Sequence, residues 1–225
     1  MYSIGIYDLD GTIWRSVAAA LDIFRTLLVQ HGAKDTPELT ETVRLNWSVH
    51  YSRWLDRFLP GYSDAKIKGI YEAIRPLSPI IPFDGVDEAL GAIQRMGVAN
   101  HILTARPRTH TQFLLHKFGQ KDLFARVVST GDYGHDKSKP SPYGANLIIN
   151  PYRKIGFDRD NAFLVGDTPN ADLECARNAG IKFVAVHEEN VITREEWLKH
   201  GVPEEDVLPS IRCLPDWLKR SNART

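Results

Sequence analysis

Cysteine and long apolar stretches are scarce in this chain of 225 residues. Its two cysteines, Cys175 and Cys213, stand in no CxxC motif and at no spacing from histidine that suggests a zinc site. A disulfide framework is therefore not expected, and a reducing cytoplasm is the simplest setting. No run of about eighteen apolar residues occurs, as a membrane span would need, and no basic segment precedes the first apolar run, as it does in a signal peptide.

The sequence also lacks an excess of either charge. Lys and Arg together number 28, as do Asp and Glu, so the formal net charge is zero. Without a global positive field, nucleic acid and anionic membranes are not expected as main partners. Hydrophobic residues make up 43% of the chain, which is ordinary for a globular protein. The composition leaves the oligomeric state open.

Short apolar runs alternate with segments of helical period over most of the chain. Each apolar run predicts a buried strand: Ile4–Tyr7, His101–Leu103, Arg126–Val128, Ala162–Val165 and Phe183–Val186. Helical patterns occupy residues 84–96, 107–118, 142–150 and 169–179, and two more lie near 193–200 and 213–220. This alternation predicts an α/β fold, with a parallel sheet of about five strands and helices on both faces.

One interval, residues 15–82, interrupts the alternation. It contains three apolar stripes at helical spacing and no convincing strand: Val17, Leu21, Phe24 and Leu28; Val43, Trp47, Tyr51, Trp54 and Phe58; Ile67, Ile70 and Ile74. Three prolines between residues 76 and 82 suit a linker at its end. We therefore expect an all-helical cap over 15–82, inserted into a core formed by 1–14 and 83–225.

Polar residues follow the predicted strands at the positions where a site is expected. The four segments are Asp8-Leu9-Asp10-Gly11-Thr12, Thr104-Ala105-Arg106, Lys139-Pro140 and Gly166-Asp167-Thr168-Pro169-Asn170-Ala171-Asp172. In open α/β sheets, ligands bind at the carboxyl ends of the strands, so these segments are expected to meet.

Their side chains suit phosphoryl transfer. A carboxylate can attack phosphorus and form an acyl phosphate, and a second carboxyl group can serve as general acid and then as general base. Magnesium bound by carboxylates can reduce the repulsion between carboxylate and phosphate. A lysine and a hydroxyl can bind the remaining phosphate oxygens.

The four segments, taken together and in this order, resemble the haloacid dehalogenase superfamily. Within it, the chain is most similar to the branch of phosphoglycolate phosphatase and β-phosphoglucomutase, which carries a helical cap after the first strand. The resemblance covers about residues 1–187. It implies a Rossmann-like core and a Mg²⁺-dependent phosphatase that hydrolyses a small phosphorylated metabolite through an aspartyl-phosphate intermediate.

The resemblance also implies roles for four carboxylates. Asp8 would be the nucleophile and a magnesium ligand. Asp10 would be the general acid and base, with its backbone carbonyl on the metal. Asp167 would be a further metal ligand, and Asp172 would hold a lysine or a metal-bound water from outside the ligand set.

Four other residues are expected to bind the phosphoryl group. Thr104 would do so through its hydroxyl, and Lys139 would neutralise both Asp8 and the phosphate. Leu9 and Ala105 would contribute backbone amides. Arg106 has no role assigned by the resemblance.

Three alternatives remain open from the sequence. A sugar phosphomutase would use the same Asp8 intermediate, and a non-catalytic family member would only bind phosphate or regulate. A dehalogenase needs no general acid for its halide leaving group, so Asp10 argues against it. Many relatives have an acidic residue and a serine a little beyond Thr12, where this chain has Ile13-Trp14-Arg15-Ser16. The identity of the substrate therefore cannot be taken from a named relative.

Overall fold

A six-stranded parallel sheet forms the centre of the protein. The computed structural model describes residues 1–46, 58–63, 65–66, 69, 80–129, 132–189 and 191–223. The strand order is β5-β4-β1-β6-β7-β8. The strands are β1 (Ile4–Tyr7), β4 (Ala99–Thr104), β5 (Arg126–Ser129), β6 (Ala162–Gly166), β7 (Lys182–Val186) and β8 (Val207–Leu208).

Strand β1 lies between β4 and β6, and this position determines where the polar segments meet. Tyr7 at its end is in register with Ile102 of β4 and with Val165 of β6. All three strands run in the same direction, so the residues that follow them lie at one edge of the sheet.

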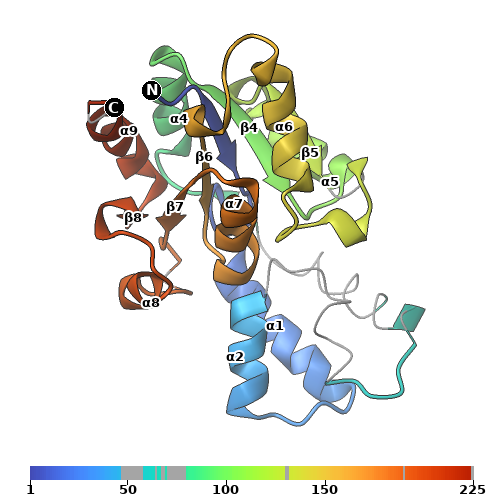
Figure 1. Ribbon diagram of the computed structural model, residues 1–225. Coiled ribbons are helices and arrows are strands. Elements are labelled where there is room, and N and C mark those ends of the chain that lie inside the picture. Colours follow the sequence, from blue (N-terminus) through green and yellow to red (C-terminus); the bar gives the residue numbers. More distant parts are fainter. Residues whose placement is uncertain are drawn as a thin grey trace.

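Alternation along the strands directs side chains to two separate core layers. In β1, Ile4 and Ile6 belong to one apolar cluster and Tyr7 to the other. The Tyr7 layer is covered by α4 (Val86–Arg95), α5 (Arg108–Lys117) and α9 (Leu214–Asn222), and the Ile4 layer by α6 (Tyr143–Arg153), α7 (Glu174–Ala179) and α8 (Arg194–Lys199). The helices therefore cover both faces (Figure 1).

The five predicted strands and the predicted α/β fold are confirmed. Strand β8 was missed because its two residues are too few to show a pattern. The segment predicted as one helix over 169–179 begins with a π-helical turn, Pro169–Leu173, and continues as α7 up to Gly180, whose φ of 66° ends it. The two predicted helices of the C-terminal tail correspond to α8 and α9.

Two helices are described in the predicted cap interval, α1 (Val17–Gln30) and α2 (Pro37–Asn46). They share an apolar cluster that includes Phe24, Leu28 and Leu39, and they lie beyond the end of the sheet where β1 stops (Figure 1). Contrary to the expectation that the interval holds no strand, β2 (Trp14–Arg15) and β3 (Ile81–Pro82) pair antiparallel at its two ends. Two-residue strands leave no periodic signal.

Several residues of the predicted apolar stripes lie outside the described part of the chain. These are Trp47, Tyr51 and Trp54 of the second stripe and Ile67, Ile70 and Ile74 of the third. Val43, with which the second stripe starts, lies in α2 and is buried.

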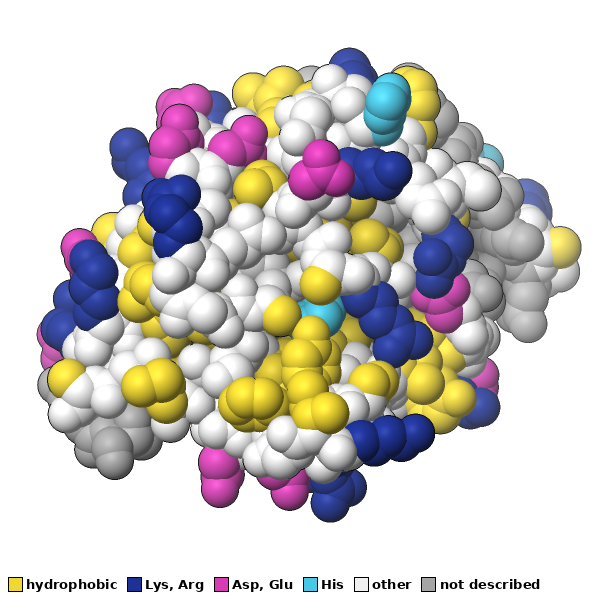
Figure 2. All heavy atoms as spheres, turned by 90° about the horizontal axis from the view of Figure 1, so that it is seen from above, with side chains coloured by type: hydrophobic (Ala, Val, Ile, Leu, Met, Phe, Trp, Pro, Cys, Tyr) yellow, Lys and Arg dark blue, Asp and Glu magenta, His cyan; other side chains and the backbone are white. Residues whose placement is uncertain are grey.

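The surface carries both signs of charge on the face shown in Figure 2. Lys and Arg side chains and Asp and Glu side chains are both present, and hydrophobic side chains lie between them. No helix among the described residues has the length and apolar character needed to cross a bilayer.

A buried histidine predicts how stability depends on pH. His101 in β4 is 2% exposed, and its Nε2 lies 2.8 Å from the Tyr152 hydroxyl. Burial, with a smaller effect of Arg126, lowers the pKa of His101 from 6.5 to about 4. Below pH 6.5 the unfolded chain therefore binds a proton that the folded chain does not bind until about pH 4. We expect the free energy of unfolding to fall over this range, by on the order of 3 kcal/mol.

Urea unfolding at a series of pH values measures this effect. His101→Gln should reduce the pH dependence of the free energy of unfolding between pH 6.5 and about pH 4. His116→Gln, at an exposed position, should leave that dependence as in the wild type. Equal pH dependence in both variants would contradict the assignment.

Candidate active site

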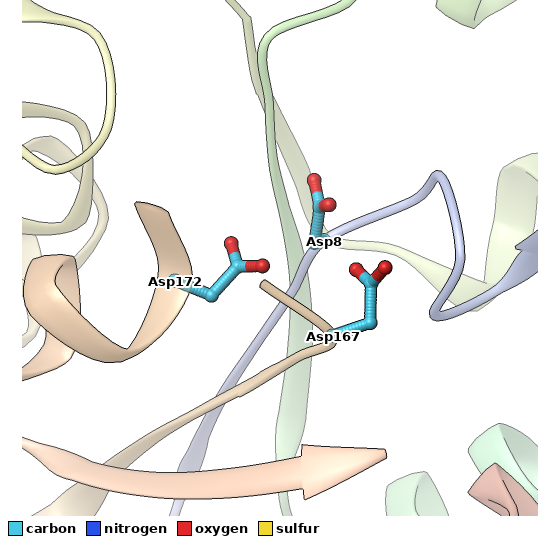
Figure 3. A group of neighbouring side chains, drawn as sticks. All are labelled: Asp8, Asp167 and Asp172. Atoms are coloured by element: carbon cyan, nitrogen blue, oxygen red, sulfur yellow. The ribbon is translucent and has the colours of Figure 1, made fainter. Parts of the chain in front are cut away.

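Three buried carboxylates converge at the carboxyl edge of the sheet. Asp8 follows β1 and Asp167 follows β6, and the N–H of Asp8 donates to the carbonyl of Val165 at 3.0 Å. Asp172 reaches the same place from the π-helical turn after β6. One oxygen of each carboxylate lies within 4.8 Å of the others, and Figure 3 shows the three side chains pointing toward one another.

Two glycines make room for these carboxylates. Gly11 has a φ of 79°, in the left-handed region that glycine adopts without strain, and a Cβ there would collide with the Asp167 carboxylate. A Cβ on Gly166 would collide with Asp172. The turn at Gly11 also brings the Thr12 hydroxyl to Asp167, where it donates to Oδ1 at 3.2 Å.

Lys139 lies between two of the carboxylates. Its Nζ is 2.8 Å from Oδ1 of Asp8 and 2.5 Å from Oδ1 of Asp172, and all three side chains are at most 3% exposed. The other oxygen of Asp172 accepts the N–H of Thr168 at 3.1 Å. The neighbouring Lys137 lies instead over the ring of Tyr143. The structure therefore brings Lys139, and not Lys137, to Asp8.

Burial and repulsion between the carboxylates raise the pKa values of acidic groups in this site. Burial raises the pKa of Asp8, the charges of Asp172 and Asp10 raise it further, and Lys139 partly opposes the rise. Burial and the charges of Asp172 and Asp8 likewise raise the pKa of Asp167. Burial alone would lower the pKa of Lys139, but Asp172 and Asp8 outweigh it and raise that pKa.

The site thus holds three buried carboxylates and one ammonium group, which contacts two of them. A divalent cation with oxygen ligands would offset the remaining negative charge, so the residues fit such an ion. This group contains Asp8 and Asp167, whose carboxylates were expected as ligands, and Asp172, which was expected beside them. Asp10 was expected to contribute its backbone carbonyl, and that role stays a prediction.

The Asp10 carboxylate is held by other partners. Both of its oxygens accept hydrogen bonds from the guanidinium of Arg106, and Oδ1 also accepts the Ser16 hydroxyl at 2.7 Å. Thr104 is the last residue of β4, and its hydroxyl oxygen accepts the N–H of Arg106 at 3.1 Å. Arg106 thus contacts two predicted site residues, although the sequence assigned it no role.

Leu9 is the second residue after β1 and Ala105 the first after β4, as expected of residues at this edge. The Leu9 side chain is fully buried, and its carbonyl accepts the N–H groups of Ile13 and Trp14 at 2.9 and 2.8 Å. These bonds fold the chain after Asp8 into a compact loop. The phosphate-binding roles of Leu9, Thr104, Ala105 and Lys139 remain predictions.

Sequence reasoning missed Glu189, which follows β7. Its carboxylate accepts the N–H groups of Ser16, Val17 and Ala18 at 3.3, 2.9 and 3.4 Å. It therefore caps α1, which has no acidic residue in its own first turn. Because the partners are 171 to 173 residues apart, no local pattern could have revealed this cap.

The sequence of this chain is similar to those of known proteins. The family model described as haloacid dehalogenase-like hydrolase matches residues 5–186. The chain is 27% identical to phosphoglycolate phosphatase of Xylella fastidiosa, over 94% of this chain and 91% of that protein. It is 22% identical to validoxylamine A 7'-phosphate phosphatase of Streptomyces hygroscopicus, over 80% of this chain and 92% of that protein.

A solved structure shares the fold. The crystal structure of β-phosphoglucomutase from Clostridium difficile matches with a TM-score of 0.73 at 16% identity, over all of this chain and 98% of that one. At this identity the match concerns the fold alone.

Replacing Lys139 tests whether its ammonium group is needed to balance the charges of Asp8 and Asp172. In Lys139→Met, the carboxylates of Asp8 and Asp172 lose their common partner and remain buried. We expect the free energy of unfolding to fall by roughly 3–5 kcal/mol without divalent cations, since an uncompensated buried charge is costly. Urea unfolding measures the loss.

Lys137→Met, at an exposed position, is the matched control and should change stability by less than about 0.5 kcal/mol. A Lys139→Met protein as stable as this control would show that the ammonium group is not needed to balance the carboxylates.

Proposed function

Because this chain belongs to the haloacid dehalogenase-like hydrolase family, we propose that it is a magnesium-dependent phosphatase acting on a small phosphorylated metabolite. The observation that carries the proposal is the buried contact between Asp8 and Lys139, beside Asp167 and Asp172. It provides a carboxylate that can attack phosphorus and positive charge that can receive the phosphate oxygens.

The first half of the reaction would transfer the phosphoryl group to Asp8. A carboxylate oxygen of Asp8 forms a bond to phosphorus while the bond from phosphorus to the ester oxygen breaks. Asp10 donates a proton to the departing oxygen, which leaves as an alcohol. Thr104 and Lys139, with the backbone amides of Leu9 and Ala105, bind the other phosphoryl oxygens.

The second half would return the enzyme to its initial state. A water oxygen attacks phosphorus, Asp10 takes a proton from that water, and the bond between Asp8 and phosphorus breaks. The products are an alcohol and inorganic phosphate. The two carboxyl groups have different surroundings, since Asp8 is buried beside Lys139 and Asp10 is held by Arg106 and Ser16.

The metal site would be formed by the carboxylates of Asp8 and Asp167 and the backbone carbonyl of Asp10, with Asp172 beside them. Bound magnesium would supply positive charge that lowers the repulsion between the Asp8 carboxylate and the phosphoryl group. The convergence of the buried carboxylates and the raised pKa values of Asp8 and Asp167 support a cation here.

The segment 15–82 would act as a cap over a core of 1–14 and 83–225. The pairing of β2 with β3 supports this division, because the chain leaves and re-enters the core at neighbouring points. The separate apolar cluster of α1 and α2 supports it as well. A cap would exclude bulk water and contact the leaving group.

The names of the relatives favour hydrolysis over phosphoryl transfer to a second sugar. Both of the relatives described above are called phosphatases, and the substrates in their names are small phosphorylated compounds.

The two cysteines, Cys175 and Cys213, are free thiols, which is in keeping with a cytoplasmic setting.

A panel of phosphorylated metabolites with magnesium tests the nucleophile. The wild type should release inorganic phosphate from at least one compound, and Asp8→Asn should release none above background, because an amide oxygen is a poor nucleophile. After acid quenching, radiolabelled phosphate should remain on the wild-type protein and not on this variant.

Asp216→Asn, which changes an exposed carboxylate of α9, is the control and should keep full activity. Phosphate release by Asp8→Asn at the wild-type rate would refute the nucleophile assignment.

Magnesium should also stabilise the fold. Since binding to the folded state adds RT ln(1 + [Mg]/Kd), we expect a higher melting temperature in excess magnesium than in EDTA. Asp167→Asn should remove most of this shift, and Asp216→Asn should retain it. An equal shift in all three proteins would place the ion elsewhere.

A further inference from the structure

The carboxylate of Asp10 is held in a fixed orientation by a two-pronged contact. Nε of Arg106 donates to Oδ2 at 3.1 Å, and Nη2 of the same guanidinium donates to Oδ1. The side chains of Arg106 and Asp10 are 9% and 17% exposed, so the contact is largely shielded from water. A bidentate pair of this kind fixes direction as well as distance.

Arg106 is itself anchored to the sheet. Its backbone N–H donates to the hydroxyl oxygen of Thr104 at the end of β4, and its Nη1 lies 3.1 Å from Nδ1 of His110 in α5. The guanidinium therefore reaches Asp10 from a defined position next to a predicted phosphate-binding residue.

A second segment of the chain also holds Asp10. The Ser16 hydroxyl donates to Oδ1 at 2.7 Å, and the backbone N–H groups of Ser16 and Val17 are bound by Glu189. Asp10 thus receives donors from two segments that are far apart in the sequence.

We propose that Arg106 is a positioning residue that acts on the reaction through Asp10. The inference rests on the proposed function, in which Asp10 moves the protons. Proton transfer requires heavy atoms about 2.6–3.2 Å apart, and a misplacement of about 1 Å costs roughly 100-fold in rate. Arg106 would hold this carboxylate in one orientation through both halves of the proposed reaction.

A double-mutant cycle on kcat tests this dependence. Arg106→Gln should lower kcat by about 10- to 100-fold with little change in KM. In an Asp10→Asn background, Arg106→Gln should have no further effect, since the group it positions is already inactive. Arg106→Lys should recover part of the rate.

The leaving group provides a second readout that a purely structural role would not change. Glycerol phosphate loses a poor leaving group that needs a proton, whereas p-nitrophenolate departs without one. The loss in Arg106→Gln should therefore be larger for glycerol phosphate than for p-nitrophenyl phosphate.

Arg108→Gln is the matched control. Arg108 lies two residues away, pairs with Asp132 and is 43% exposed, so this variant should keep the wild-type rates. The free energy of unfolding is measured for both variants. If Arg106→Gln is as stable as Arg108→Gln, its loss of rate does not come from unfolding.

The outcomes distinguish this inference from the proposed function. A wild type that releases phosphate from no phosphomonoester overturns the proposed function and the inference with it. If the wild type is active, two results overturn the inference alone. In the first, the effects of Arg106→Gln and Asp10→Asn on kcat multiply; in the second, Arg106→Gln mainly raises KM. The second result would mean that Arg106 binds the substrate directly.

Discussion

The ion pairs of Lys139 with Asp8 and Asp172 are the interaction on which the site depends. Three carboxylates within 4.8 Å of one another and removed from water would repel strongly, and the buried ammonium group offsets part of that repulsion. The arrangement is tolerated because hydrogen bonds from Thr12 and Thr168 also reach the acidic groups. The charge that remains is what makes the site receptive to a cation.

The sheet supplies the rigidity that this cluster requires. Asp8 and Asp167 follow neighbouring parallel strands in fixed register, so backbone hydrogen bonds set their separation. Gly11 and Gly166 allow the chain to pass close to the carboxylates where a side chain would collide. A mobile loop could not hold like charges so close without losing conformational entropy as well.

Asp10 has a different environment although it lies only two residues from Asp8. Its carboxylate accepts hydrogen bonds from Arg106 and Ser16, and it is not a member of the group of three. In the proposed mechanism, this segment would hold the nucleophile and the proton carrier two residues apart. Glu189 extends the connection from the core to α1, and Arg44 of α2 pairs with Glu196 of α8. The helices after β1 are therefore joined to the core close to the carboxylates.

The sequence by itself determined the α/β fold, the five longer strands and the segments that carry the acidic residues, because strand burial and helical periodicity are local properties. It also singled out Lys139 and Asp172, which the fold brings together. The contact of Arg106 with Asp10 and the cap that Glu189 provides could not be predicted in this way. They join residues 96 and 171 to 173 positions apart, and their formation depends on strand order and register, which no local pattern encodes.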